Sequence, residues 1–212
     1  MILLGIAGKG KSGKNQLAIY LWNYFAEKYK IEFIFGAFAD ELKQMCIDHF
    51  GLTRDQLWGD GKEKTTLYGK NELDSLGLSS NPADYWSPRE IMQALGAFYR
   101  TIDYDFWVKK FDENFQKSDQ KDVIITDIRH INECEYIKKH GTLIKLVRSE
   151  QQKIHGMDHE SETALDGKPD EYFDIVINND GTLDDLRQAS KNVADAIMKL
   201  QNLKNEGKIY NG

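Results

Sequence analysis

The stretch GIAGKGKSGKNQLA, residues 5–18, decides the fold. An apolar run at 2–7, typical of a buried parallel strand, leads into it, and a stretch with helical spacing of apolar residues follows. From Gly8 to Lys14 the pattern is G-x-x-x-x-G-K, in which glycines let backbone N–H groups surround phosphate oxygens and the lysine adds a charge. We therefore expect nucleotide contacts from this loop, at Gly8, Lys11, Ser12, Gly13, Lys14, Asn15 and Gln16.

Asn15 departs from the usual pattern of such a loop. A Ser or Thr normally follows the lysine, and its hydroxyl binds Mg²⁺. The amide oxygen of Asn15 can coordinate the metal weakly or through water, because Mg²⁺ often keeps several waters. Two readings follow: a working nucleotide site with an altered metal ligand, or a nucleotide-binding protein without turnover.

Composition limits the class of protein. A chain of 212 residues with 41% hydrophobic residues is long and apolar enough for one domain with a substantial core. Its net charge of −6 argues against a nucleic-acid coat protein. The two cysteines lack metal-site spacing, and no apolar run reaches the length of a membrane span. We expect a cytoplasmic protein that binds neither nucleic acid nor a membrane.

Strands and helices alternate along the chain. The apolar patterns predict strands at 2–7, 31–38, 122–128, 142–147 and 173–180. They predict helices after the phosphate loop and at 40–50, 87–100, 105–115, 132–141 and 183–200. This order is typical of an α/β three-layer sandwich with a mostly parallel sheet, here as a single domain over 1–212. The stretch 51–85 is rich in polar residues and glycine, which predicts a long loop or mobile insert.

Polar side chains follow the predicted strands, where α/β sheets bind ligands. Asp127 follows a buried strand, the place for a carboxylate that holds an Mg²⁺-bound water, and Arg129 could face the phosphates. Asp40 and Lys43 follow the second strand; they either contact an acceptor or form a helix start with a surface lysine. Amides after the last strand can read the edge of a base, at Asn178, Asp180 and Gly181.

Two arginines are placed for an acceptor phosphate. Arg89 and Arg100 are eleven residues apart, about three helical turns, so they lie on roughly one helix face. Two guanidinium groups on one face suit a phosphate held by paired hydrogen bonds. The alternative is surface ion pairing with neighbouring carboxylates, at Glu90, Asp103 or Asp105. Aromatic residues nearby could stack on a base or pack in the core: Trp86, Tyr99 and Trp107.

The segment 147–162 is charged and has few apolar anchors. It is either a solvated loop or a lid that closes over phosphates, with Arg148 at its base as a ligand of the transition state. His155 and His159 lack the partners of a zinc site.

Several of these motifs occur together in one known family. The chain resembles the P-loop nucleoside monophosphate kinases, and within them the phage deoxynucleoside monophosphate kinases. The resemblance rests on GKGKSGKN, FADELK, SPREIMQALG with the following Arg100, VIITDIRHINECEYIKKHG, HESE and VINNDGTLDDL, and covers 2–186. In the phage kinases, Asp and Thr typically follow the loop lysine, where this chain has Asn15 and Gln16.

The resemblance implies ATP-dependent phosphorylation of deoxynucleoside 5′-monophosphates, with Mg²⁺, in the host cytoplasm if the chain is phage-encoded. It implies catalytic roles for Lys14, Arg129, Arg148 and Asp40, and metal placement by Asp127 through water. Asn15, which departs from the family pattern, is a second candidate metal ligand from its amide chemistry. The acceptor would bind within 38–116, with the lid at 148–168, through Asp40, Lys43, Trp86, Arg89, Arg100, Trp107 and Glu162.

Several alternatives stay open at this point. The same fold could act on another small acceptor such as dephospho-coenzyme A, or bind nucleotide as a regulatory protein without turnover. The base preference is open because 51–85 matches the family poorly. A homodimer is also left open.

Overall fold

A computed structural model describes residues 1–63, 66–70, 84–117, 122–149, 165 and 167–205. The chain divides into two compact units. Unit 1 comprises Met1–Phe38 and Phe115–Gly212, and unit 2 comprises Ala39–Asn114. Each unit has a hydrophobic core of its own.

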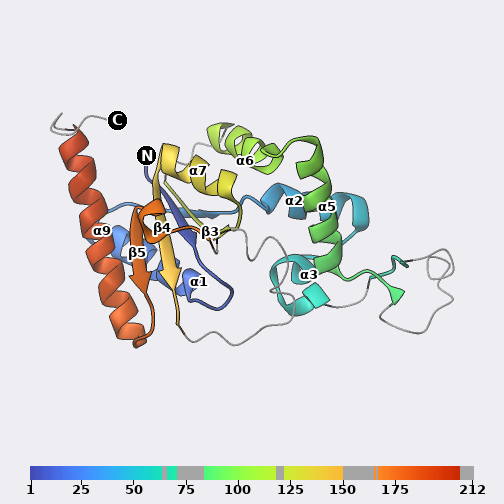
Figure 1. The fold of residues 1–212 in the computed structure, drawn as a ribbon, viewed down its shortest axis with the longest axis horizontal. Coiled ribbons are helices and arrows are strands. Elements are labelled where there is room, and N and C mark those ends of the chain that lie inside the picture. The colour runs from blue at the N-terminus through green and yellow to red at the C-terminus, as the bar shows by residue number, and fades with distance from the viewer. Residues whose placement is uncertain (64–65, 71–83, 118–121, 150–164, 166, 206–212) are drawn as a thin grey trace. The chain divides into compact units, whose positions relative to one another are not determined.

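Unit 1 is built on a five-stranded parallel sheet (Figure 1). Its order is β2-β3-β1-β4-β5. The strands are β1 (Leu3–Ala7), β2 (Ile34–Gly36), β3 (Val123–Ile128), β4 (Thr142–Val147) and β5 (Ile175–Asn178). Strand β1 lies at the centre and all its residues are buried, as an apolar run predicts for a strand covered on both faces. The predicted α/β fold with a mostly parallel sheet is confirmed.

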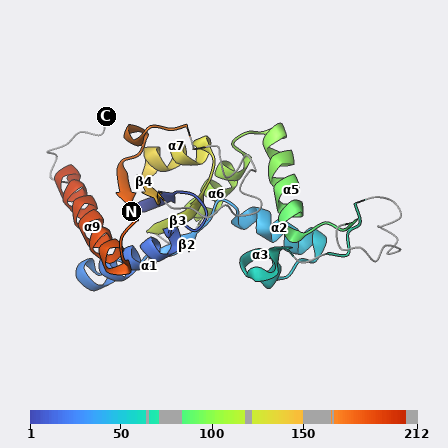
Figure 2. The same ribbon diagram turned by 60° about the horizontal axis from the view of Figure 1, so that its bottom comes forward.

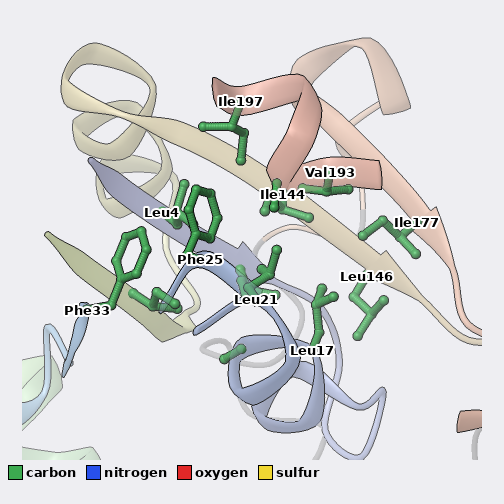
Figure 3. Packing of buried hydrophobic residues seen from close by; sticks show 14 of the residues in the cluster. Leu4, Leu17, Leu21, Phe25, Phe33, Ile144, Leu146, Ile177, Val193 and Ile197 are labelled. Carbon is green, nitrogen blue, oxygen red and sulfur yellow. The ribbon is translucent and has the colours of Figure 1, made fainter. Parts of the chain in front are cut away.

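Helices cover both faces of this sheet (Figure 2). On one face lie α1 (Lys14–Tyr24) and α9 (Leu183–Asn205), which pack against each other. Figure 3 shows the core they enclose, with Leu17 and Leu21 of α1 and Val193 and Ile197 of α9 around strand residues such as Ile144. On the other face, α7 (Ile131–His140) packs against β1 and β4. Central β1 is therefore clamped between helical layers.

The end of α1 is locked to α9 by a small polar cluster. Helix α1 continues into a π-helical turn, Phe25–Tyr29, which ends at Lys30 in the left-handed conformation. The carboxylate of Asp195 in α9 accepts hydrogen bonds from the Tyr29 hydroxyl at 2.7 Å and from the Lys28 ammonium at 2.8 Å. These contacts fix the far end of the helix that begins at the phosphate loop.

Unit 2 is helical. It contains α2 (Asp40–Phe50), α3 (Arg54–Trp58), a 3₁₀ turn η2 (Asp60–Glu63), α5 (Pro88–Ile102) and most of α6 (Phe106–Lys117). Its core gathers apolar side chains from α2, α3, α5 and α6: Leu42, Cys46, Leu52, Leu57, Ile91 and Trp107. Helix α5 starts as predicted, because Ser87 accepts from the Glu90 N–H and the Glu90 carboxylate accepts from the Ser87 N–H.

Helix α3 corrects the prediction of a long loop or insert over 51–85. The Thr53 hydroxyl accepts from the Gln56 N–H at 3.3 Å, and the Gln56 side chain accepts from the Thr53 N–H at 2.8 Å. This capping box, together with burial of Leu57, stabilises a short helix in a sequence that is otherwise polar. Residues 71–83 of the predicted loop lie outside the described residues.

Within the described ranges, no helix is long and apolar enough to cross a membrane. Both cysteines are buried thiols.

Candidate active site

The phosphate loop connects the central strand β1 to helix α1. Its last residue before the helix, Gly13, has φ 102°, a backbone conformation that residues with a side chain rarely adopt. A Cβ on Gly13 would also lie 2.7 Å from the amide nitrogen of Asn179. The loop is therefore built around a glycine at the N-terminus of α1, where free N–H groups and the helix dipole favour an anion.

Lys14 turns back onto its own loop. Its ammonium donates to the carbonyl oxygen of Gly8 at 2.6 Å and to that of Lys9 at 2.8 Å. Burial and the positive charge of Arg129 lower the pKa of Lys14 from 10.5 to about 8, and the carboxylate of Asp127 opposes that shift. The charges of Arg129 and Asp127 thus both act on Lys14.

Asp127 lies near the carboxyl end of β3. Its carboxylate accepts from the Phe38 N–H at 3.3 Å, which anchors it to the segment after β2. The side chain of Arg129 is exposed, while its N–H donates to Glu133 at 2.7 Å. The backbone of Arg129 is thereby fixed at the start of α7, and the charge of its side chain acts on Lys14.

Asp180 binds the chain that leaves β4. Its two carboxylate oxygens accept from the N–H and the hydroxyl of Ser149, both at 2.7 Å. These hydrogen bonds, with a smaller contribution from the charge of Arg148, lower the pKa of Asp180. The start of α9 is capped by Thr182, whose hydroxyl accepts from the Asp185 N–H.

Sequence reasoning covered Asn179 only as part of the segment 178–181 and did not predict its contact with the phosphate loop. Asn179 is 9% exposed, and its amide donates to the carbonyl oxygen of Ser12 in the phosphate loop at 2.8 Å. Ser12 itself is fully buried, and its hydroxyl has no hydrogen-bond partner among the described residues. The alternation of β5 gave a signal: Ile177 is buried and Asn178 exposed, so the next side chain points inward again.

In unit 2, Asp40 and Lys43 lie on the first turn of α2. The Lys43 ammonium is 3.9 Å from the Asp40 carboxylate and 4.7 Å from the centre of the Trp58 ring. Trp58 is 42% exposed, and the Arg54 guanidinium lies 5.2 Å from the same ring. The structure adds to the predicted pair an exposed aromatic ring between two cations, which the sequence interpretation did not include because it treated this stretch as a loop.

Arg89 and Arg100 lie at the two ends of α5, and both are half-buried. An N–H of the Arg100 guanidinium donates to the carbonyl oxygen of Gly96 at 3.1 Å. Two carboxylates considered as ion-pair partners are engaged elsewhere: Glu90 by Lys70 at 2.9 Å, and Asp103 by Lys109.

The three aromatic candidates of unit 2 differ in exposure. Trp107 is 2% exposed and its indole N–H donates to the Gly96 carbonyl, so it belongs to the core and not to a stacking surface. Tyr99 is half-buried and lies edge-on to Trp107. Trp86 is half-buried, and its backbone N–H donates to the backbone carbonyl oxygen of Tyr68 at 2.8 Å. Of the two tryptophans predicted to bind substrate, Trp107 is therefore buried in the core and Trp86 is not fully buried.

Some predicted features cannot be placed. Glu162, His155, His159 and most of the predicted lid lie outside the described residues. Arg148, at the base of that segment, is exposed. Within the part of the chain that the structure describes, His, Cys, Asp and Glu side chains form no cluster of three or more that could hold a metal ion.

Comparison with known proteins gives a consistent result. The family described as deoxynucleotide monophosphate kinase matches residues 43–190. A deoxynucleotide monophosphate kinase of Escherichia phage RB69 is 37% identical, covering 88% of this chain and 96% of that protein. The enzyme of the same name from Enterobacteria phage T4 is 30% identical, over 65% of this chain and 57% of that protein. A mimivirus protein with the same kinase name is 27% identical, over 88% and 92%.

The parallel sheet, with a phosphate-binding loop after its central strand and cations around that loop, defines a P-loop nucleotide-binding protein. Within this class, the chain belongs to the deoxynucleotide monophosphate kinase family. The family and enzyme class predicted from the resemblance are confirmed. The relatives named above give no support to a dephospho-coenzyme A kinase or to a nucleotide-binding protein without turnover.

Proposed function

We propose that this protein transfers the γ-phosphoryl group of ATP, in the presence of Mg²⁺, to deoxynucleoside 5′-monophosphates. The observation that carries the proposal is the phosphate loop at the start of α1, where Gly13 has φ 102° and the Lys14 ammonium folds back onto the carbonyl oxygens of Gly8 and Lys9. Partial burial of the Lys14 ammonium beside the charge of Arg129 is costly until an anion binds there. The loop is therefore suited to bind a polyphosphate. Family membership supplies the acceptor class.

On the donor side, the loop from Gly8 to Gly13 would surround the β- and γ-phosphates, with Lys14 as the principal charge. Arg129 and Arg148 would neutralise the charge that develops during transfer. Lys11, Ser12, Asn15 and Gln16 would contribute further loop contacts. Asn178, Asp180 and Gly181 would lie beside the adenine, with Asp180 holding its segment through Ser149.

On the acceptor side, Arg89 and Arg100 would grip the 5′-phosphate, because guanidinium groups hold phosphate oxygens by paired hydrogen bonds. Asp40 and Lys43 would orient the same phosphate, and Trp86 would contact the base. Glu162 is proposed for the acceptor site from the family motif alone. The acceptor phosphate is largely ionised at neutral pH, so the site needs alignment and charge neutralisation more than a strong base.

The residues fit a magnesium ion held mainly by the nucleotide. Asp127 supplies one carboxylate near the loop, Asn15 is exposed at the start of α1, and the described residues offer no acidic cage. Mg²⁺ in kinases is typically bound by one or two carboxylates together with substrate phosphates and waters. When bound, the ion would supply charge neutralisation at the phosphates, and Asp127 would orient its waters.

The direct test is acceptor-dependent release of ADP from ATP and Mg²⁺. The purified chain is assayed with each deoxynucleoside monophosphate, each ribonucleoside monophosphate and dephospho-coenzyme A. Product diphosphates are identified by chromatography, so that ATP hydrolysis to water is not mistaken for transfer. We expect turnover with at least one deoxynucleoside monophosphate and its absence with dephospho-coenzyme A. If no nucleotide stimulated ADP release, the proposal would be wrong.

A further inference from the structure

Asn179 joins three parts of unit 1 that sequence separates widely. Its N–H donates to the carbonyl oxygen of Val147 at the end of β4, at 2.7 Å. Its side-chain amide donates to the carbonyl oxygen of Ser12 at 2.8 Å, in a buried hydrogen bond. It is the residue next after β5, so the ends of β4 and β5 and the phosphate loop meet at one residue.

Shape reinforces these hydrogen bonds. The amide nitrogen of Asn179 lies where a Cβ on Gly13 would be only 2.7 Å away, so the side chain packs directly against the loop backbone. Asn179 is 9% exposed, which shields its hydrogen bond to Ser12 from competing water. The buried side-chain amide of Asn179 therefore sets the position of the Ser12 carbonyl.

The geometry of the peptide bond transmits this restraint to the loop's donors. In a trans peptide, the carbonyl of one residue and the N–H of the next point in opposite directions. Because Asn179 draws the Ser12 carbonyl towards itself, the Gly13 N–H must point away from Asn179. A free rotation of this peptide, which the glycine would otherwise permit, would turn a carbonyl oxygen towards a bound phosphate in place of a donor.

We infer that Asn179 is a positioning residue of the donor site, which holds the Ser12–Gly13 peptide so that the Gly13 N–H faces the phosphates of ATP. The inference rests on one part of the proposed function, the binding of ATP at the phosphate loop. It assigns to Asn179 a role distinct from base contact, which the exposed neighbour Asn178 is better placed to make.

The experiment compares Asn179→Ala with Ser190→Ala in the full chain. Ser190 is also buried, and its hydroxyl donates to the Arg187 carbonyl at 2.7 Å in α9, so its loss removes a comparable hydrogen bond away from the loop. Melting temperature, kcat and the two KM values are measured for both. For Asn179→Ala we expect the KM for ATP to rise about five- to tenfold, the effect of one orienting hydrogen bond. We expect kcat to fall, the acceptor KM to stay unchanged, and Ser190→Ala to leave all three kinetic constants as in the wild type.

Two further measurements separate the possible failures. ADP affinity, measured by calorimetry, tests the inference even if the wild type shows no acceptor-dependent turnover, and we expect Asn179→Ala to weaken it by a similar factor. If Asn179→Ala does not fold, Asn179→Ser takes its place, because the serine side chain is polar but too short to reach Ser12. We expect it to weaken ADP affinity by a similar factor. A folded variant with wild-type ADP affinity, or with ATP and acceptor KM values raised equally, would overturn the inference.

Discussion

The ammonium group of Lys14 donates to the carbonyl oxygen of Gly8 across 2.6 Å, so the lysine of the phosphate loop is bound by the first glycine of that loop. The pKa of this lysine is lowered to about 8 by burial first and by Arg129 second. Lys14 therefore begins to lose its charge at a pH near 8, so the effect of pH on the protein reports on this site.

Lys14 should make stability depend on pH in alkaline solution. Because its folded pKa lies below its unfolded value, the unfolded chain binds more protons between about pH 8 and pH 10.5, and stability contributed by this group rises with pH there. Relative to Lys14→Met, the wild type should gain about 2 kcal/mol between pH 8 and pH 10. Urea unfolding of both proteins at several pH values measures this gain, and parallel curves would contradict the lowered pKa.

Lys14→Ala should abolish measurable turnover, because the principal charge on the donor phosphates is lost. Lys9→Ala, which removes an exposed side chain from the same loop, is the matched control and should retain wild-type kcat. Both variants are assayed for acceptor-dependent ADP release at pH 7. Equal activity of the two variants would remove Lys14 from the catalytic centre.

Arg100→Ala should raise the acceptor KM and lower kcat while the KM for ATP stays constant. A lost charge-assisted hydrogen bond typically costs about 1.5–3 kcal/mol, which predicts a roughly tenfold or larger effect on kcat/KM for the acceptor. Arg100→Lys should recover little of it, because an ammonium group cannot replace the paired donors of a guanidinium. Arg187, which pairs with Asp184 on exposed α9, provides the control substitution Arg187→Ala. Unchanged acceptor kinetics in Arg100→Ala would exclude it from the site.

Asp127 and Asn15 should differ in their effect on the magnesium requirement. Asp127→Asn removes the charge that orients metal-bound water, and we expect the Mg²⁺ concentration for half-maximal rate to rise about tenfold or more. Asn15→Ala should change it about twofold if nucleotide and water hold most of the ion. Titration of activity with Mg²⁺ at saturating ATP compares them. A larger effect from Asn15 would identify its amide as a direct ligand.

Gly141 offers a test of the core beneath the site. A Cβ there would collide with the carbonyl oxygen of Leu3 in β1, so Gly141→Ala must displace the central strand from the end of α7. We expect a loss of about 3 kcal/mol in the free energy of unfolding. Gly51→Ala, at φ 61° with open space around it, should cost only about 1 kcal/mol. Urea titration ranks the two variants, and equal losses would contradict the close approach.

Sequence patterns predicted the order of elements because the period of apolar residues is strong in them. The run at 2–7 could be read as a buried parallel strand, and Ser87 with Glu90 marked the start of α5 to the residue. Helix α3 was missed because one buried residue, Leu57, carries its packing, and the signal was only the cap at Thr53.

For the candidate site, sequence located the strand-end charges but not their contacts. That Lys14, Asp127 and Arg129 share one field follows from parallel strands that end at the same edge. The role of Asn179 depends on a 2.8 Å contact across 167 positions of sequence, which no local pattern encodes. The burial of Trp107 was equally undecided, because stacking and core packing favour the same residue type.

The central place of β1 in the sheet has a consequence for how the protein opens. A strand bonded on both edges and covered on both faces exchanges its amide hydrogens only when the whole unit unfolds. The phosphate loop follows directly after β1, so the carboxyl end of that strand cannot fray independently of the fold. Ligand binding at the loop is therefore linked by mass action to unfolding of unit 1 as a whole, and saturating nucleotide should slow exchange throughout the sheet.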